Sequence, residues 1–196
     1  MRLSAHTSRK TVTVNTSIPY SYGDYHMGGI LKLLQIDQFF DSVEVQKLRQ
    51  VLYGLQFVQK EYGKEIDNFQ LILPDINEIL SQVLHHSVAI EEARSGVFRR
   101  PETHIHFESF TKVNDWVFVV ALEDTTFNTF RHLSGAESAL DGYKFNYRNL
   151  LEWDVETNIQ LRQNSCIFFR PWLFHSFDGG LIQTYRLSSI GKSFNT

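Results

Sequence analysis

The chain has 196 residues, with 19 basic and 22 acidic side chains and a formal net charge of −3. This length suits one domain with a sizeable core, and the lack of a basic block makes nucleic acid an unfavoured partner. A single cysteine, Cys166, excludes an internal disulfide, and the longest apolar run, residues 116–122, is too short to span a membrane. We therefore expect a single domain, residues 1–196, in the cytoplasm and with no membrane partner.

The first part of the chain predicts a tail and two helices. Residues 1–23 are polar, with several Ser and Thr, and are expected to form a flexible or edge-packed tail. A capping-box pattern from Asp41 to Glu44 precedes apolar residues at helical spacing and predicts a helix of about four turns. A second helix is expected over residues 74–86, so residues 24–86 would form a helical support.

From residue 87 onward the spacing of apolar residues changes to a period of two, which is typical of strands. Short strands are predicted at residues 87–90, 96–99, 103–110, 116–122, 126–131, 157–161, 167–169 and 182–188. Two helices followed by these strands indicate an α+β fold whose sheets form a sandwich or barrel over residues 87–191.

Two runs of aromatic and branched residues flank an Asp-Gly-Gly sequence at 178–180. This pattern predicts a hairpin with the two glycines in the turn, and His175 then lies opposite Thr184. Because side chains alternate along a strand, His175, Arg186 and Ser188 would share one face. An apolar wall has little reason to carry those three groups unless a ligand lies between them.

A second polar group lies in the predicted strand 103–110. There His104, His106 and Glu108 would share a face, about 6.6 Å apart from one to the next. Two histidines and one carboxylate that leave other positions open suit non-haem Fe(II) and its oxygen chemistry. His106, Glu108 and His175 are therefore the candidate metal ligands, and His104 is expected to be a nearby hydrogen-bond donor or a solvated residue.

This combination resembles the 2-oxoglutarate- and Fe(II)-dependent oxygenases, in particular their prolyl-hydroxylase-like branch. Members of that family carry H-x-D/E, a distal His, and an Arg or Lys a short way after it. His106 and Glu108 match the first motif, and His175 matches the distal His. Arg186 matches the cation that binds the distal carboxylate of the cosubstrate, and Arg186 with Ser188 matches the R-x-S pattern of some members.

The resemblance extends over residues 35–190 and implies a double-stranded β-helix, a jelly-roll or cupin-like barrel, with N-terminal supporting helices. It implies Fe(II) on the catalytic residues His106, Glu108 and His175, with 2-oxoglutarate bound through Arg186 and Ser188. It also implies O₂ as a partner and decarboxylation of 2-oxoglutarate to succinate. The coupled reaction would be oxidation, most simply hydroxylation, of a small molecule or a peptidyl side chain.

Two departures from the family pattern keep other functions open. Aspartate is commoner than glutamate at the position of Glu108, and related halogenases carry a small residue there, so Glu108 argues against halogenation. The His104-x-His106 pair is similar to cupins, and a cupin-type metalloprotein without 2-oxoglutarate would use these two residues with His175. A β-sandwich binding module without a metal is the third hypothesis.

The connection after residue 131 supplies candidate substrate contacts. Arg131 and His132 either line a substrate pocket or lie at a solvated loop end. Residues 135–156 form a long connection of the kind that often acts as a lid. Its aromatic residues could cover a substrate or pack on the outside of the barrel: Tyr143, Phe145, Tyr147 and Trp153.

Overall fold

The computed structural model describes residues 12–13, 32–40, 43, 46, 49–50, 53–54, 56–60, 63–66, 76–84, 86–91, 96–99, 105–108, 110, 112–141 and 144–190. The predicted tail, apart from the short strand β1 (Val12–Thr13), lies outside these residues. His104 and Tyr143 lie outside them as well.

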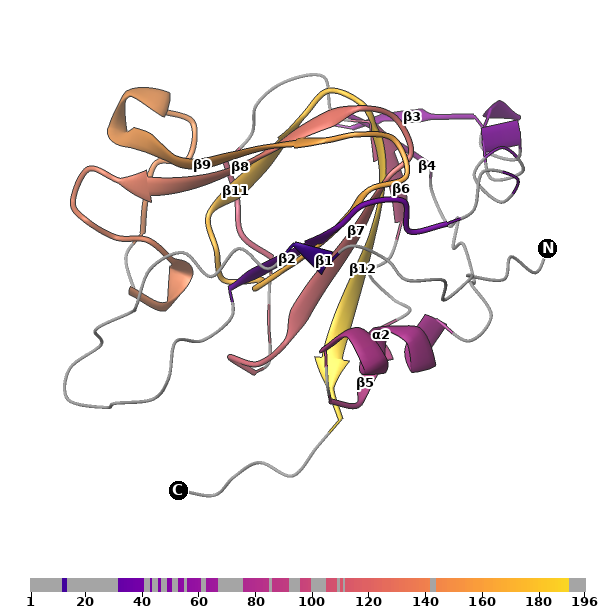
Figure 1. The fold of residues 1–196 in the computed structure, drawn as a ribbon. Coiled ribbons are helices and arrows are strands. Elements are labelled where there is room, and N and C mark those ends of the chain that lie inside the picture. The colour runs from indigo at the N-terminus through magenta and orange to yellow at the C-terminus, as the bar shows by residue number, and fades with distance from the viewer. Residues whose placement is uncertain are drawn as a thin grey trace.

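Two antiparallel sheets make up most of the described fold (Figure 1). The larger sheet has the order β1-β2-β10-β7-β12-β6-β4-β3, and β5 pairs with β12 beside this path. Its further strands are β2 (Leu33–Ile36), β3 (Val58–Lys60), β4 (Gly63–Ile66), β5 (Val88–Ile90), β6 (Gly96–Arg99), β7 (Trp116–Ala121), β10 (Cys166–Phe169) and β12 (Leu181–Ser189). The smaller sheet has the order β11-β8-β9, with β8 (Thr125–His132), β9 (Trp153–Leu161) and β11 (His175–Asp178). This arrangement agrees with the expected jelly-roll type of fold.

The space between the sheets is filled by apolar side chains. Every residue of β7 is buried, and alternate residues along it point to opposite faces. Val117 and Val119 pack on the same cluster as Phe127 of β8 and Phe177 of β11. This cluster therefore forms the interior that the two sheets share.

The opposite face of the larger sheet packs against α2 (Ile76–Leu84). Phe118 and Phe168 stack with ring centroids 4.7 Å apart, and Leu80 of the helix belongs to the same buried cluster. The second predicted helix is thus confirmed, with its apolar stripe on the sheet. Of the first predicted helix the structure describes only residues 43, 46, 49–50 and 53, and these are helical.

The hairpin predicted across Asp-Gly-Gly at 178–180 is wrong. β11 pairs with β8, so that His175 lies opposite Thr129, whereas β12 pairs with β7 and places Arg186 opposite Val117. The glycines carry the chain from the smaller sheet to the larger one. Gly179 and Gly180 both have positive φ, of 73° and 67°, so the chain bends there as glycines allow, but the bend leads into the other sheet and not back along β11.

The strand predicted over residues 103–110 is also not formed among the residues described there, 105–108 and 110. His106 makes a single isolated bridge, to His175, and no ladder continues from it. By contrast, β9 begins at Trp153, four residues before the predicted strand at 157, so the long connection before it is shorter than expected. Two short 3₁₀ helices, Ala139–Asp141 and Leu150–Glu152, lie in that connection.

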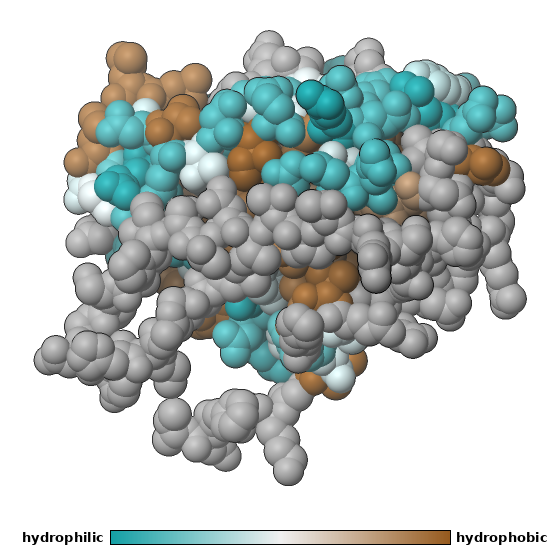
Figure 2. Space-filling model, viewed as in Figure 1, coloured by the Kyte–Doolittle hydropathy of each residue, from teal (hydrophilic) through white to brown (hydrophobic). Residues whose placement is uncertain are grey.

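The outer surface differs between the two ends of the smaller sheet. In the upper part of the face drawn in Figure 2, teal polar residues predominate, with brown apolar residues gathered at the upper left and in smaller patches elsewhere. The strongly exposed apolar side chains near the start of β9 include Leu150, Leu151 and Val155. Among the described residues, no helix has the length and apolar character needed to cross a bilayer.

Candidate metal centre

The backbone fixes two histidines next to each other. The His106 N–H donates to the His175 carbonyl at 3.0 Å, and the His175 N–H donates to the His106 carbonyl at 2.8 Å. Residues paired in this way on antiparallel segments carry their side chains on the same face. The two imidazole rings accordingly lie with centroids 4.2 Å apart.

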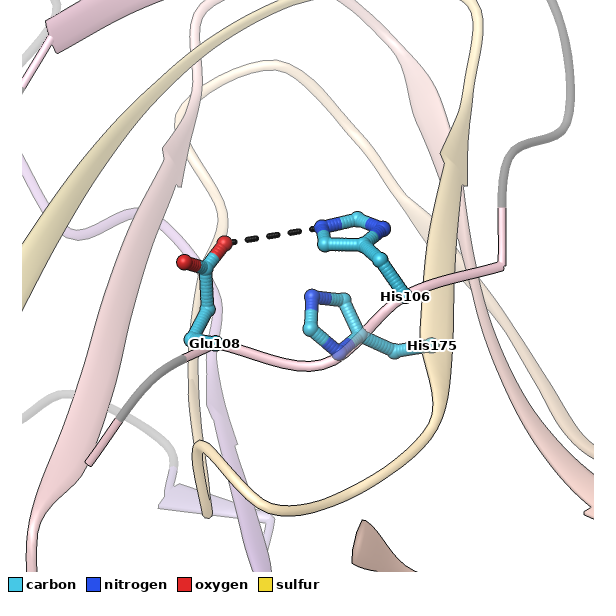
Figure 3. Close-up of side chains that lie close together, drawn as sticks. All are labelled: His106, Glu108 and His175. Carbon is cyan, nitrogen blue, oxygen red and sulfur yellow. Dashed lines mark ion pairs between the residues drawn. The ribbon is translucent and has the colours of Figure 1, made fainter. Parts of the chain in front are cut away.

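Glu108 reaches the same place by a further backbone contact. Its N–H donates to the carbonyl of Pro171, at 2.9 Å, in the turn between β10 and β11. Figure 3 shows its carboxylate turned toward the two imidazoles, and the distance from Glu108 Oε1 to His106 Nε2 is 3.5 Å. The segment 105–108 is therefore held at both ligand positions by the residues around β11.

The three side chains satisfy the spatial requirement of one metal ion. Their ligand atoms all lie within 4.8 Å of one another. Neighbouring ligands of an octahedral ion with bonds of about 2.1 Å lie about 3 Å apart. The ligand atoms of His106, Glu108 and His175 would have to approach one another by less than about 2 Å to reach that spacing. Two imidazoles and one carboxylate also form the donor set that suits non-haem iron.

A hydrogen bond determines which nitrogen of His175 is available. Nδ1 of this residue lies 2.9 Å from the carbonyl oxygen of Leu173, which can only accept a hydrogen bond. Nδ1 therefore carries the proton, and the lone pair is on Nε2. Metal-bound histidines commonly have this arrangement, because the second nitrogen fixes the orientation of the ring.

The surroundings of His175 are apolar and aromatic. The side chain is 1% exposed, and its ring lies 4.5 Å from that of Phe169 and 5.9 Å from that of Phe127, centroid to centroid. His106 and Glu108 are more open, with side chains 17% and 25% exposed. The site is thus closed on the His175 side and accessible on the other.

A buried arginine anchors the turn that leads to His175. Arg170 donates to the carbonyl oxygens of Asn114, at 2.7 Å, and Asp115, at 3.2 Å, and its guanidinium lies 3.7 Å from the centre of the Trp116 ring. Burial lowers the pKa of Arg170 to about 10, although the charge of Asp115 opposes this shift. The side chain therefore stays charged at neutral pH and can hold both carbonyls.

Arg186 and Ser188, the predicted cosubstrate residues, lie on the strand across the interior. Arg186 is 6% exposed. It lies four residues after Ile182 on β12 and therefore on the same face of the strand, and Ile182 packs in the interior cluster. Arg186 therefore faces the space between the sheets, as does His175 from the opposite sheet. The Ser188 hydroxyl lies 3.5 Å from the carbonyl oxygen of Ala89, its partner on β5.

Arg131 and His132, the predicted substrate contacts, interact with other side chains of the protein. Arg131 lies 2.9 Å from carboxylate oxygens of both Glu137 and Glu156. Its pKa is raised, first by the hydrogen bond to Glu156 and then by the charge of Glu137. The His132 ring packs 4.4 Å from that of Phe145, centroid to centroid.

A pocket of about 320 Å³ lies between His106 and the long connection. Phe145 and Tyr147 of that connection line it, whereas Arg131 and His132 are not among its lining residues. The remaining lining residues are Ile105, His106, Phe107, Asn146 and Arg148. Of these, Phe107, Asn146 and Arg148 were missed by sequence reasoning. The position of Phe107 between His106 and Glu108 was a sequence signal that could have identified it.

Comparisons with known proteins agree on the fold. No protein-family model matches the chain, and no curated protein matches it in sequence. Among solved structures, HygX from Streptomyces hygroscopicus with nickel, 2-oxoglutarate and hygromycin B bound is 12% identical, with a TM-score of 0.52 and 84% of each chain covered. The non-heme alpha-ketoglutarate-dependent epimerase SnoN from nogalamycin biosynthesis is 16% identical, with a TM-score of 0.56, and 80% of this chain and 76% of SnoN are covered.

The carbocyclase SnoK from the same pathway, also described as non-heme and alpha-ketoglutarate-dependent, is 8% identical, with a TM-score of 0.55. The alignment with SnoK covers 81% of this chain and 79% of that one. At these identities the likeness establishes a shared fold. The resemblance to the fold of 2-oxoglutarate- and iron-dependent enzymes, first seen in the sequence motifs, is therefore confirmed.

Proposed function

We propose that this protein is an Fe(II)- and 2-oxoglutarate-dependent oxygenase that hydroxylates a small molecule. The observation that carries the proposal is the convergence of the ligand atoms of His106, Glu108 and His175 within 4.8 Å, inside a fold shared with HygX, solved with nickel and 2-oxoglutarate bound, and with the alpha-ketoglutarate-dependent epimerase SnoN. HygX and a SnoN complex were each solved with 2-oxoglutarate and a small molecule bound. A small molecule is for this reason preferred to a peptidyl side chain as the substrate.

In this proposal three side chains hold the metal, and each has a separate part. His175 offers Nε2 in a fixed direction, because its Nδ1–H is held by the Leu173 carbonyl. His106 is kept beside it by the paired backbone hydrogen bonds, and Glu108 supplies the negative charge. An Fe(II) ion on these ligands would supply the activation of O₂, with electrons from the decarboxylation of 2-oxoglutarate.

The chain also orients the cosubstrate and excludes water. Arg186 presents a guanidinium to the interior, where a planar fork suits a ligand carboxylate. The aromatic residues Phe127 and Phe169 beside His175 keep solvent from the closed side of the centre. The substrate would approach from the more open side, where the pocket meets His106.

A cupin-type metalloprotein that does not use 2-oxoglutarate is the second candidate function. It would replace Glu108 by His104 as a ligand. The 3.5 Å contact between Glu108 and His106 favours the first proposal, because it already places the carboxylate at the centre. The inward position of Arg186 favours it too, because the cupin alternative assigns no role to a cation there.

Turnover of 2-oxoglutarate tests this function directly. Protein supplied with Fe(II), ascorbate and O₂ is expected to convert 2-oxoglutarate to succinate slowly without substrate and faster with a suitable one. The reaction is followed by quantifying succinate by mass spectrometry, with a Glu108→Ala variant as the blank. Metal-loaded protein that forms no succinate above this blank, with or without any tested substrate, would contradict the proposal.

A further inference from the structure

The interior contains a polar atom that the fold itself does not use. Thr184 is 6% exposed, and its Oγ1 is buried without a hydrogen-bond partner among the residues that the structure describes. Thr184 lies opposite Val119, a member of the interior cluster, so its side chain faces the space between the sheets. A buried hydroxyl left unpaired is unfavourable, and such a group in a native structure calls for an explanation.

Thr184 and Arg186 lie two residues apart on the same face of β12. That separation is about 7 Å along the strand, which the long arginine side chain can span. A hydroxyl donor and a guanidinium can therefore reach the same carboxylate. Ser188 is less well placed for this role, because it is less buried than Thr184 and its hydroxyl is turned toward Ala89.

We propose that Thr184, rather than Ser188, donates the hydroxyl hydrogen bond to the acid that Arg186 binds. The proposal rests on the proposed function for the identity of that acid, 2-oxoglutarate. It departs from the R-x-S pattern, in which the hydroxyl follows the arginine. Thr184 Oγ1 is then the atom that contacts the ligand. This role explains why it has no hydrogen-bond partner among the described residues of the protein.

The test compares Thr184→Val, which removes the hydroxyl and keeps the shape, with Ser188→Ala. Calorimetric titration of 2-oxoglutarate into Ni(II)-loaded protein is expected to give about five- to tenfold weaker binding for Thr184→Val. Ser188→Ala is expected to stay within about twofold of the wild type. Unchanged affinity in Thr184→Val, or a larger loss in Ser188→Ala, would overturn the assignment.

Stability separates this role from a structural one. Replacing an unpaired buried hydroxyl by a methyl group is expected to raise the melting temperature of the ligand-free protein. If the role of Thr184 were purely structural, its substitution would instead lower the melting temperature of the protein. If wild-type protein binds no 2-oxoglutarate at all, the proposed function fails; if wild type binds it and Thr184→Val binds equally, only the present assignment fails.

A second inference comes from the pocket beside His106, whose walls are mostly rings. Tyr147 stacks on Trp153 at 5.6 Å and lies 6.2 Å from Phe107, centroid to centroid. Burial raises the pKa of the Tyr147 hydroxyl, and the side chain is half-buried. Phe145 packs edge-on to the same tyrosine at 6.4 Å. These rings are braced against one another and form a preformed apolar surface.

The polar part of the pocket is small and carries one cation. Among the described residues that line it, the polar side chains are His106, Asn146, Tyr147 and Arg148, and none of them is a carboxylate. A sugar ring would find only these polar side chains for its many hydroxyls, whereas an aromatic ring can pack on the rings that make up the rest of the lining. A volume of about 320 Å³ is that of a small ligand site.

We infer that the pocket takes a ring-bearing apolar molecule with an anionic group, such as an aryl carboxylate. The ring would lie against Phe107 and Tyr147, and the anion would lie near Arg148. The pocket that contains this wall is also lined by His106, one of the three candidate metal ligands. This inference names the substrate class of the proposed enzyme and rests on that proposal only for the reaction that follows binding.

Binding without metal tests it independently. In EDTA-treated protein, 3-phenylpropionate is expected to change the fluorescence of Trp153 and to bind more tightly than 3-phenylpropan-1-ol, 3-phenylpropylamine or methyl glucoside. Phe107→Ala is expected to weaken 3-phenylpropionate binding about tenfold, and Arg148→Gln about two- to fivefold. Arg162→Gln, an exposed arginine just after the far end of β9, is the control.

Preference for the glucoside or the amine, or equal binding by the Phe107→Ala protein, would overturn the substrate class. The proposed function would survive that result, because succinate formation does not depend on this panel. Conversely, binding of 3-phenylpropionate by protein that forms no succinate would uphold the site and contradict the reaction.

Discussion

Replacing Arg186 by glutamine removes the cation on which cosubstrate binding is proposed to depend. Because Arg186 is 6% exposed and faces the interior, solvent weakens its contact with a carboxylate far less than at the surface. A hydrogen bond to a charged group contributes about 1.5–3 kcal/mol. Its loss corresponds to about a ten- to hundredfold weaker affinity for 2-oxoglutarate.

The assay is calorimetric titration of 2-oxoglutarate into Ni(II)-loaded protein, together with metal content and thermal melting of each variant. Arg186→Lys is expected to fall between wild type and Arg186→Gln, because lysine keeps the charge and loses the planar fork. Arg162→Gln, which changes an exposed arginine, serves as the matched control. A folded Arg186→Gln protein with normal metal content and unchanged 2-oxoglutarate affinity would refute the reasoning.

Three further changes test other parts of the account. Glu108→Asp withdraws the carboxylate by about 1.5 Å and is expected to leave reduced but measurable succinate formation; wild-type activity would indicate that Glu108 does not bind the metal. His104→Ala is expected to retain metal by elemental analysis, and loss of metal there with retention in Glu108→Ala would favour the cupin alternative. Gly180→Ala places a Cβ 2.6 Å from the Asp124 carbonyl oxygen, whereas a Cβ at Gly179 meets nothing within 4 Å. Both substitutions are expected to lower the free energy of unfolding by about 1–2 kcal/mol for their positive φ, and Gly180→Ala by more; equal denaturant midpoints would contradict the role of the close approach.

Local patterns predicted the elements well, because each element depends on neighbours in the chain. The apolar spacing in α2 placed Leu80 on the sheet, and the alternation in β6 gave the strand its correct bounds, Gly96–Arg99. The Asp-Gly-Gly signal also marked a bend of the chain, although the bend joins two sheets and does not form the predicted hairpin. It could not reveal that Gly180 packs against Asp124, because that contact joins segments far apart in sequence.

For the same reason, local patterns could not predict which strands pair or which residues surround the polar side chains. Glu108 is positioned by a hydrogen bond to Pro171, which lies in another part of the chain. Arg131 is neutralised by Glu137 and Glu156, neither of which its own strand contains. The candidate ligands were nevertheless found in advance, because a metal site needs specific residue types and those are visible in sequence.

Measuring Fe(II) binding tests most directly the central claim that His106, Glu108 and His175 bind a metal ion. Anaerobic titration of Fe(II) into purified protein is expected to show one site per chain. His106→Ala, Glu108→Ala and His175→Ala should each weaken binding at least about tenfold. His86→Ala, which changes a half-buried histidine whose ring is hydrogen-bonded at the end of α2, should bind as the wild type does. Wild-type affinity in all three ligand variants, or no Fe(II) binding by the wild type, would contradict the account.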